Sequence, residues 1–329
     1  MTKLTELLGI IKDKASQSKA ALLSKRATLS LLRATSHDSF TPPTHKHIST
    51  LLSSGEGSRA TASAVVEVLM NRLQGTNNSA VALKCLIAVY HIINRGSFIL
   101  QDQLSVYPSA GGRNYLNLSN FRHRNDSVSW ELSSWVRWFA QHVEQLLCTS
   151  RILGFFIGNS PRDREEGVSG LTNADLLTQF DSLVTLVEWI CKRPDPSSMK
   201  GNKLVEEIVN LVHEDWIVIQ TEVSIQVSEF KERLSCMKFG EAVELVCCLK
   251  RLEECKEMIM IIMMLEMEQR HRLWDLVREV KEKTGTGVYK EKGKVQKEIR
   301  KERVSESHRF SSRVLISADS FHFPSGRLL

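Results

Sequence analysis

Apolar residues recur at helical spacing along most of the chain. At the N-terminus, the spacing i, i+3, i+4, i+7 predicts an amphipathic helix with lysines on or beside its polar side, formed by Leu4, Leu7, Leu8 and Ile11 together with Lys3, Lys12 and Lys14. The pattern fits two interpretations. The apolar stripe either lies on a membrane or packs on the body of the protein.

Longer stretches with the same periodicity predict a protein made of helices. They cover residues 20–32, 47–52, 61–73, 79–93, 130–147, 171–190, 203–230 and 239–280. The stretch 203–230 is one helix or a pair, and residues 101–128 and 161–170 read as loops. Strand alternation and hairpin turns of comparable strength are absent. The predicted fold is therefore all-α, a superhelical solenoid of stacked helix hairpins.

Two apolar clusters raise the question of core or binding surface. The aromatic residues Trp130, Trp135, Trp138 and Phe139 share a helical spacing that is typical of core. The methionine-rich run Met258–Leu265 fits core filler, and it also fits an adaptable groove that takes a partner helix.

Charge is distributed unevenly along the 329 residues, although the formal net charge is only +6. Residues 1–50 carry eight Lys and Arg against three Asp and Glu, whereas residues 51–280 carry 24 against 29. A basic front end on a slightly acidic body predicts that the N-terminal region faces an anionic surface. Zinc-finger spacing, RNP-like strands and a basic helix in the body are missing, so we expect no nucleic-acid partner.

The seven cysteines form no Cys-x-x-Cys pair, and a reduced, cytosolic protein is predicted. No signal peptide is expected, since charged residues interrupt the short apolar run near the N-terminus. The longest apolar run is far shorter than the ~20 residues that a membrane span requires.

A candidate anion site follows Leu31 and Leu32. Pro42 ends the preceding helix, and Pro43 suits the first position of a new one, with Thr41 or Pro42 near the cap. A helix start offers unpaired N–H groups and a positive dipole end, which favour phosphate. The residues expected to bind it are Arg33, His45, Lys46 and His47.

Two other interpretations of this stretch are open. It fits an ordinary helix–turn–helix connection with solvated polar residues. Zinc is disfavoured, because His45 and His47 are two positions apart and point about 200° from each other on a helix. No metal and no cofactor are predicted.

The same residues carry a family resemblance. Arg33-Ala-Thr-Ser-His37, then Pro42-Pro43, then Lys46-His47 resembles the phosphoinositide motif of ANTH domains, the N-terminal module of clathrin-assembly adaptors of the CALM family. Later blocks resemble plant members in the same order, so that the resemblance spans roughly residues 20–280: Ala80-Val-Ala-Leu-Lys-Cys-Leu-Ile87, Leu118-Ser-Asn-Phe-Arg122 and Ser134-Trp-Val-Arg-Trp-Phe-Ala140.

The chain departs from the family motif in three places. Arg33 replaces its first lysine, Thr44 stands where a lysine would follow the proline, and one extra residue lies between His37 and Pro42. These departures predict a weaker site.

The resemblance implies a membrane adaptor that binds phosphoinositides, with phosphatidylinositol 4,5-bisphosphate foremost, and acts in clathrin-mediated endocytosis and vesicle trafficking. It implies clathrin heavy chain and vesicle SNAREs as partners, and a peripheral location on coated pits and vesicles, the plasma membrane and the Golgi apparatus. A different interpretation is a helical scaffold that binds only proteins and has lost lipid binding.

The expected domains are residues 1–283, the ANTH-like domain, and residues 284–329, a basic and largely disordered tail. The tail lacks Asp-Pro-Phe and Asn-Pro-Phe motifs, and Leu315-Ile-Ser-Ala-Asp319 is a poor clathrin box. The basic run Lys290–Arg303 would strengthen attachment to an anionic leaflet. Membrane binding is therefore expected to exceed clathrin binding.

Motifs for catalysis are lacking as well. The chain has no phosphate-binding Gly-x-x-x-x-Gly-Lys loop, no Gly-x-Ser-x-Gly elbow and no His-Glu-x-x-His helix. No catalytic residue is predicted, and we expect a non-enzyme.

Overall fold

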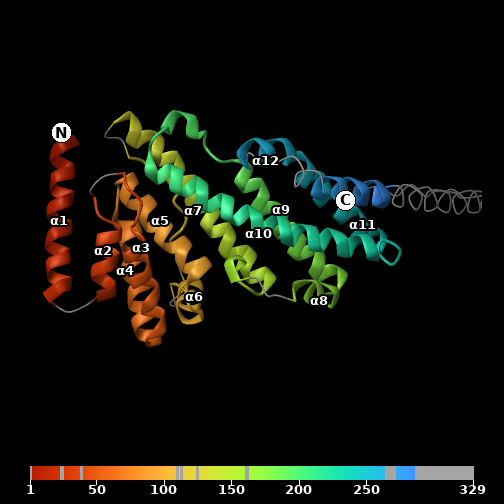
Figure 1. Ribbon diagram of the computed structural model, residues 1–329, viewed down its shortest axis with the longest axis horizontal. Coiled ribbons are helices and arrows are strands. Elements are labelled where there is room, and N and C mark those ends of the chain that lie inside the picture. Colours follow the sequence, from red (N-terminus) through yellow and green to blue (C-terminus); the bar gives the residue numbers. More distant parts are fainter. Residues whose placement is uncertain are drawn as a thin grey trace, which may run out of the picture.

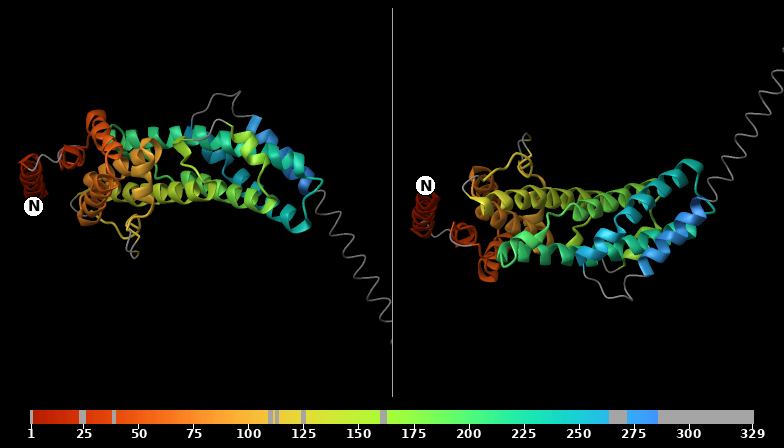
Figure 2. Two further views of the ribbon diagram at one scale, coloured as in Figure 1. Left: turned by 90° about the horizontal axis from the view of Figure 1, so that it is seen from below. Right: turned by 90° about the horizontal axis from the view of Figure 1, so that it is seen from above.

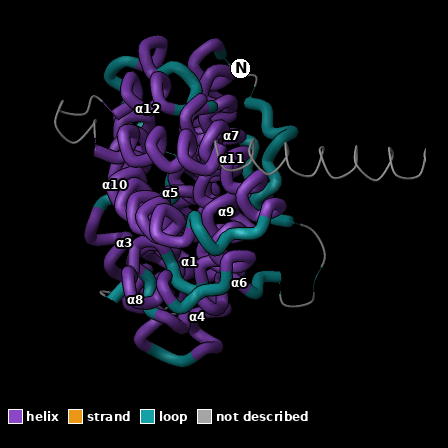
Figure 3. The backbone as a smooth tube through the Cα atoms, turned by 90° about the vertical axis from the view of Figure 1, so that its right-hand side faces the viewer, coloured by secondary structure: helices purple, strands orange, loops and turns teal. Residues whose placement is uncertain are grey.

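The computed structural model describes residues 2–22, 26–37, 40–108, 111, 114–123, 126–159, 163–263 and 272–285. Within these ranges the chain forms helices joined by turns and loops, without a β-strand, as Figure 3 shows. The all-α prediction is confirmed. The first two residues of the predicted tail 284–329, Thr284 and Gly285, are helical, and the rest of the tail lies outside the described residues.

The N-terminal half consists of shorter helices that lead to one long helix. In chain order these are α1 (Thr2–Leu22), α2 (Arg26–Ala34), α3 (His45–Leu52), α4 (Arg59–Gly75), α5 (Ser79–Arg95), α6 (Phe98–Ser105) and α7 (Ser127–Leu153), with a short 3-10 turn η1 (Ser53–Glu56) between α3 and α4. The periodicity had merged the end of α1 with α2 into one helix over residues 20–32.

The C-terminal half is built on two long helices that carry smaller ones. Its elements are η2 (Ile157–Asn159), α8 (Arg164–Ser169), α9 (Asn173–Cys191), η3 (Pro196–Met199), α10 (Lys203–Arg233), α11 (Phe239–Glu254) and α12 (Lys256–Met263). Residues 272–285 are helical as well. The stretch 203–230 is thus one helix, whereas the single helix expected over 239–280 is interrupted after Glu254.

The helices stack along one axis, each against its neighbours in the chain or one further on. α5 packs on α4, α6 and α7, α9 packs on α7, α10 and α11, and α10 also reaches α5. Figures 1 and 2 show the result, an elongated and gently curved body with α1 at one end and residues 272–285 at the other. This is the predicted superhelical solenoid of stacked helices.

Burial explains why α5 is the centre of the N-terminal half. Fifteen residues in a row, Ser79–Ile93, are buried, as its nearly continuous apolar sequence predicts for a helix covered on all sides. The helix begins at Asn78, whose side chain accepts from Val81 N at 3.1 Å, a favourable N-cap.

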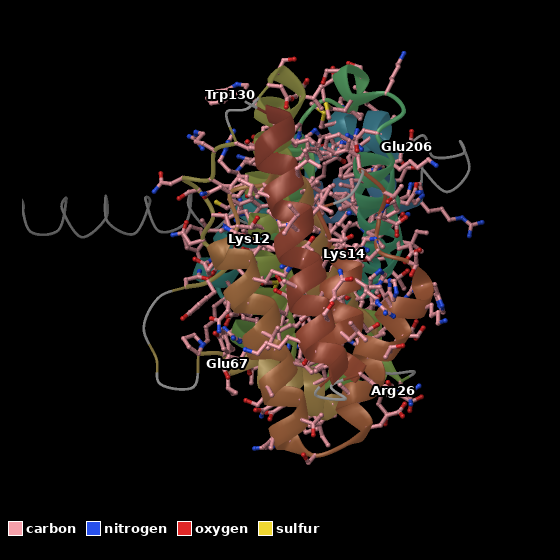
Figure 4. The ribbon with its side chains drawn as sticks, turned by 90° about the vertical axis from the view of Figure 1, so that its left-hand side faces the viewer. Lys12, Lys14, Arg26, Glu67, Trp130 and Glu206 are labelled. Carbon is pink, nitrogen blue, oxygen red and sulfur yellow. The ribbon has the colours of Figure 1, made fainter. Side chains whose placement is uncertain are left out.

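The aromatic residues of α7 divide between core and surface. Trp135, Trp138 and Phe139 are buried, as predicted, whereas Trp130 is 54% exposed in the first turn of the helix. The core prediction is therefore wrong for Trp130. At the start of α7 the solenoid supplies no neighbouring helix to cover that face, and Figure 4 shows Trp130 at the margin of the molecule.

A second difference is the stretch 161–170, which was expected to be a charged loop. It contains the short helix α8, because Arg164 reaches across to the buried Glu222 of α10, with Nη2 2.6 Å from Oε1. A hydrogen-bonded ion pair of this kind compensates both charges for leaving water.

A buried polar cluster joins three helices in the middle of the solenoid. Asp215 of α10 is 2% exposed. Its carboxylate accepts from Tyr90 Oη at 2.7 Å and Asn94 Nδ2 at 3.1 Å, both on α5, and from His142 Nε2 of α7 at 2.8 Å. Burial and the neighbouring Asp215 raise the pKa of Tyr90, so its hydroxyl stays a donor.

The N-terminal helix α1 is held by a smaller polar cluster around Asp13. The Asp13 carboxylate accepts from His37 N at 2.6 Å, from His37 Nδ1 at 2.8 Å and from Arg72 Nη2 of α4 at 2.7 Å. Gly9 lies over the His37 ring, where an added Cβ would meet Cδ2 at 2.6 Å. The close approach of α1 therefore depends on this glycine.

Much of the apolar stripe of α1 is exposed. Leu7, Leu8 and Ile11 are 55%, 50% and 62% exposed, while Asp13 and Ala20 are buried. For these three residues the interpretation in which the stripe packs on the body is wrong. The Asp13 contacts fix the rotation of α1, and they turn the polar side inward. Leu4 also belongs to the stripe, but its side chain lies outside the described residues.

We predict that Asp215→Ala lowers the free energy of unfolding by about 3–5 kcal/mol, because three donors lose their shared acceptor and His142 stays buried. Urea denaturation measures the change. Glu214→Ala is the matched control: it removes the adjacent carboxylate, which pairs with Arg95 at the surface at 3.1 Å, and is expected to cost about 1 kcal/mol or less. Equal losses in both variants would contradict the assignment.

We predict that Asp13→Ala releases α1. Burial alone would raise the pKa of Asp13, but the hydrogen bonds from His37 and Arg72 outweigh it and hold the pKa at about 2. The stabilisation is therefore complete above the ordinary value of 3.8 and is lost as pH falls through about 2. At neutral pH, amide hydrogen exchange in residues 2–22 should accelerate in Asp13→Ala and remain unchanged in α5. The exposed neighbour provides the control Lys14→Ala, which should leave both regions unchanged.

Candidate anion-binding site

The predicted anion site lies where α2 ends and α3 begins. Arg33 is exposed in the last turn of α2, and Lys46 is exposed in the first turn of α3. Ser30 Oγ donates to His47 O at 3.0 Å, so the two helices are fixed to each other beside these cations. The turn thus presents side chains from two helices on one surface.

The helix α3 begins later than its two prolines suggested. Thr44 is the N-cap, with φ −71° and ψ 146°, and the first helical hydrogen bonds run from His47 N at 2.9 Å and Ile48 N at 3.1 Å to Thr44 O. Pro43 was expected at the first helical position, with the cap at Thr41 or Pro42, and both expectations are wrong. Threonine takes the cap because its extended backbone suits that position.

Thr44 does not cap the helix with its side chain. Its hydroxyl lies 3.0 Å from Nδ1 of His47, and no amide of the first turn donates to it. The contact engages Nδ1, so Nε2 is the ring nitrogen that can turn towards a ligand. The amides of His45 and Lys46 precede the first helical hydrogen bond, as at any helix start.

The protonation of His47 reports the local electrostatic potential. Its pKa is lowered, first by partial burial, then by Arg33 and then by Lys46. Arg33, Lys46 and His47 are therefore close enough for the two permanent charges to oppose a third. None of the carboxylates in the described ranges forms an ion pair with Arg33 or Lys46, and a positive surface without compensation is suited to an anion.

His45 is directed elsewhere. Its Nδ1 lies 3.2 Å from Ser49 Oγ, one turn further along α3. His45 acts on His91 of α5, whose pKa falls to about 4 through burial, then Arg95 and then His45. The structure thus brings three of the four predicted residues together and places His45 at the side of the group.

His37 belongs to the same sequence motif, yet it lies with Asp13 and Arg72 on the other side of the turn. A cavity of about 690 Å³ opens between α1 and the body there, lined in part by Lys12, His37 and Arg72. Two of these cationic groups are already bound to Asp13, so this cavity offers an anion less uncompensated charge than Arg33 and Lys46 do.

Further cations surround α1 at the same end of the molecule. In Figure 4, Lys12 and Lys14 project from opposite sides of α1, and Arg26 lies near its lower end. All three are exposed. Leu7, Leu8 and Ile11 of the same helix are exposed, so this end of the protein is both cationic and apolar.

Other kinds of site are not supported by the described residues. In those ranges no three His, Cys, Asp or Glu side chains gather in a way that could hold a metal ion. None of the described helices combines the length and the apolar composition that crossing a bilayer requires.

Comparison with known proteins agrees with the helical stack. A family model described as the ANTH domain matches residues 27–260. Three proteins of Arabidopsis thaliana, each named a putative clathrin assembly protein, are similar to this chain. The first is 46% identical over all of this chain and 99% of its own length. The others are 32% identical over 77% of this chain and 78% of the relative, and 30% identical over 78% and 91%.

The domain match covers well over half of the chain, and two of the alignments pair about four fifths of it with relatives at 30% identity or more. The resemblance read from the Arg33 and Lys46 motif is thereby confirmed. The chain belongs to the ANTH-domain family of clathrin assembly proteins.

Proposed function

We propose that this protein is a peripheral membrane adaptor whose α2–α3 turn binds phosphoinositide head groups. The observation that carries the proposal is the position of Arg33 and Lys46, which are both exposed at the α2–α3 turn and form no ion pair with a carboxylate of the described ranges. A lipid head group with several phosphates carries negative charge that would balance Arg33 and Lys46. Because the lipid lies in a membrane, the other exposed cations of this end of the protein can contact the same anionic surface. Phosphatidylinositol 4,5-bisphosphate is the head group to test first.

Each residue has a distinct role in this proposal. The planar guanidinium of Arg33 takes two phosphate oxygens, and Lys46 provides a point charge. His47 donates from Nε2 while Thr44 engages Nδ1. His45 is an outer contact, since its ring is engaged with Ser49.

The helix α1 adds an apolar contact to the charged one. Its exposed Leu7, Leu8 and Ile11 lie at the end of the molecule that also carries Lys12 and Lys14. A helix with an apolar face flanked by lysines binds at the head-group boundary of an anionic leaflet. We therefore propose that α1 lies on the membrane while Arg33 and Lys46 hold the lipid head group.

The partners beyond lipid follow from the relatives. Since they are named clathrin assembly proteins, we propose that this chain contributes to clathrin coat assembly in endocytosis and contacts clathrin heavy chain. Coated pits and vesicles, the plasma membrane and the Golgi apparatus are the proposed locations. The weak clathrin-box match at Leu315–Asp319 and the basic run 290–303 lie outside the described residues.

A vesicle SNARE helix is proposed as cargo for the methionine-rich segment. Met258 and Ile261 of α12 are 45% and 70% exposed, while Ile259 between them is buried. The described part of this segment is thus core on one side and an apolar surface on the other, which supports a groove for an amphipathic helix.

We predict that Arg33→Ala combined with Lys46→Ala abolishes binding to liposomes containing phosphatidylinositol 4,5-bisphosphate. Each charged contact to phosphate is worth about 1–3 kcal/mol, so affinity should fall at least about thirtyfold by sedimentation, with an unchanged helical circular dichroism spectrum. The control, Lys200→Ala with Lys250→Ala, removes the same charge from exposed positions outside the turn. Undiminished binding by the first variant would favour the scaffold without lipid binding.

We predict that lipid affinity rises as pH falls. In the free protein the pKa of His47 lies below its ordinary 6.5, and phosphate favours the imidazolium form and raises the pKa. At pH values between the free-state pKa and the lipid-bound pKa of His47, lipid binding takes up a proton. Lipid affinity should therefore increase about tenfold for each unit by which phosphate raises this pKa, and it should level off below the free-state pKa. Titrations of liposomes from pH 8 to pH 5.5 measure this. His47→Gln should flatten the profile, and an equally steep profile in that variant would exclude His47.

A further inference from the structure

Two cysteines from distant parts of the chain meet at the junction of three helices. Cys191 is the last residue of α9, and Cys255 lies between α11 and α12. The Sγ of Cys191 lies 3.8 Å from the backbone oxygen of Cys255, so the two cysteines touch where α9 packs on α11 and α12. Figure 1 shows α11 and α12 beside α9 in the C-terminal half.

Cys255 lies at the point where two helices join. Cys255 ends α11 with φ −76° and ψ −15°, and its carbonyl accepts from Ile259 N at 2.9 Å, the bond that starts α12. The residue therefore joins the two helices, and it is nearly buried, whereas Cys191 is partly exposed. A small oxidant can approach from the side of Cys191.

The other cysteines lie in different surroundings. Cys85 is fully buried, and burial raises its pKa to about 12. Cys248 has a pKa of about 12, raised by burial and then by Asp181. Cys236 and Cys247 are exposed, and Cys148 is half-buried, with its pKa raised by burial and then by Glu144. The 191–255 pair is distinguished by a direct contact between two cysteines that are remote in sequence.

The two thiols are also electrostatically unequal. The neighbouring Cys191 lowers the pKa of Cys255, whereas Cys255 and burial raise that of Cys191. Arg251 also favours the Cys255 thiolate, while burial, Glu188 and Glu254 oppose it. Cys255 is thus the thiol that ionises first, and Cys191 is the thiol placed to react with it afterwards.

We propose that Cys191 and Cys255 form a site of reversible oxidation, at which hydrogen peroxide converts the thiol pair to a disulfide. The Cys255 thiolate attacks one peroxide oxygen, the O–O bond breaks, and with one proton the products are a sulfenic acid and water. The Cys191 sulfur then attacks the Cys255 sulfur, the S–O bond breaks, and the Cys191 proton leaves with hydroxide as a second water. Two thiols lose two electrons, and peroxide is reduced to two waters.

The disulfide would fasten the C-terminal end of α9 to the α11–α12 junction. In the reduced protein, backbone hydrogen bonds alone connect Cys255 to α11 and α12. A covalent link across more than sixty residues restricts the unfolded chain and holds the junction in place. Thiols of this pair are reduced in a reducing compartment, so the modification is transient.

The test uses the full chain, treated with hydrogen peroxide, alkylated and digested without reductant. Mass spectrometry should find a peptide that links Cys191 to Cys255 and disappears with dithiothreitol. The melting temperature should rise by about 5 °C on oxidation and return on reduction. Cys191→Ser and, separately, Cys255→Ser should abolish both effects. Cys236→Ser with Cys247→Ser, the matched control at exposed cysteines, should preserve them.

Other outcomes overturn the proposal. They are oxidation of Cys236 and Cys247 while Cys191 and Cys255 stay free, a disulfide that joins two copies of the chain, and a linked peptide that forms without any reversible change in melting temperature. Cys191 is partly exposed and is the milder of the two substitutions. The mapping on the unaltered chain decides the question even if Cys255→Ser folds poorly.

Discussion

The carboxylate of Asp215 is the contact on which the alignment of the long helices depends. In a solenoid most contacts join neighbouring repeats, and apolar ridges can pack in more than one register. Asp215 removes this freedom, because it must receive hydrogen bonds from Tyr90, Asn94 and His142 to remain buried. We infer that the cluster specifies how α5, α7 and α10 are placed along one another, more than it adds to net stability.

A buried aspartate that accepts several hydrogen bonds also organises the N-terminal end, with a different consequence. Asp13 attaches α1 through His37 and Arg72, so α1 needs little apolar contact to stay in place. Its leucines are free to face outward. Most helical stability in proteins comes from tertiary contacts, and the polar attachment supplies such contacts while the apolar face stays exposed. The polar attachment uses one side of the helix and leaves much of the apolar stripe exposed.

The sequence predicted the fold best where an apolar pattern is long and fits a single type of secondary structure. The buried run of α5 left few alternatives, and the periodic stretch of α10 left open whether it forms one helix or a pair. The two wrong predictions depended on packing against other parts of the chain. The helix α8 forms in a charged stretch because Arg164 finds Glu222 58 positions away, and Trp130 is exposed because no helix covers that turn. Contacts between residues so distant leave no periodic signal.

In the candidate site too, the sequence predicted which nearby residues lie together and missed the contacts between distant ones. The motif predicted that Arg33, Lys46 and His47 would lie together, because one short turn joins them. It did not predict that His37 would leave the group for Asp13, which is 24 positions away, nor that His45 would face Ser49 and His91. The start of α3 at His45 depends on the extended backbone of Thr44, which two adjacent prolines do not determine.

The cations of the N-terminal region therefore belong to two classes that a charge count cannot separate. Arg72 is bound to a carboxylate and holds helices together. Arg33 and Lys46 lie on one surface, and their charge is expressed in the pKa of a neighbouring histidine. What divides the classes is whether the fold brings a carboxylate within reach. Since Asp13 is turned towards His37 and Arg72, the positive potential of the α2–α3 turn remains, and it is this residual charge that can attract an anionic surface.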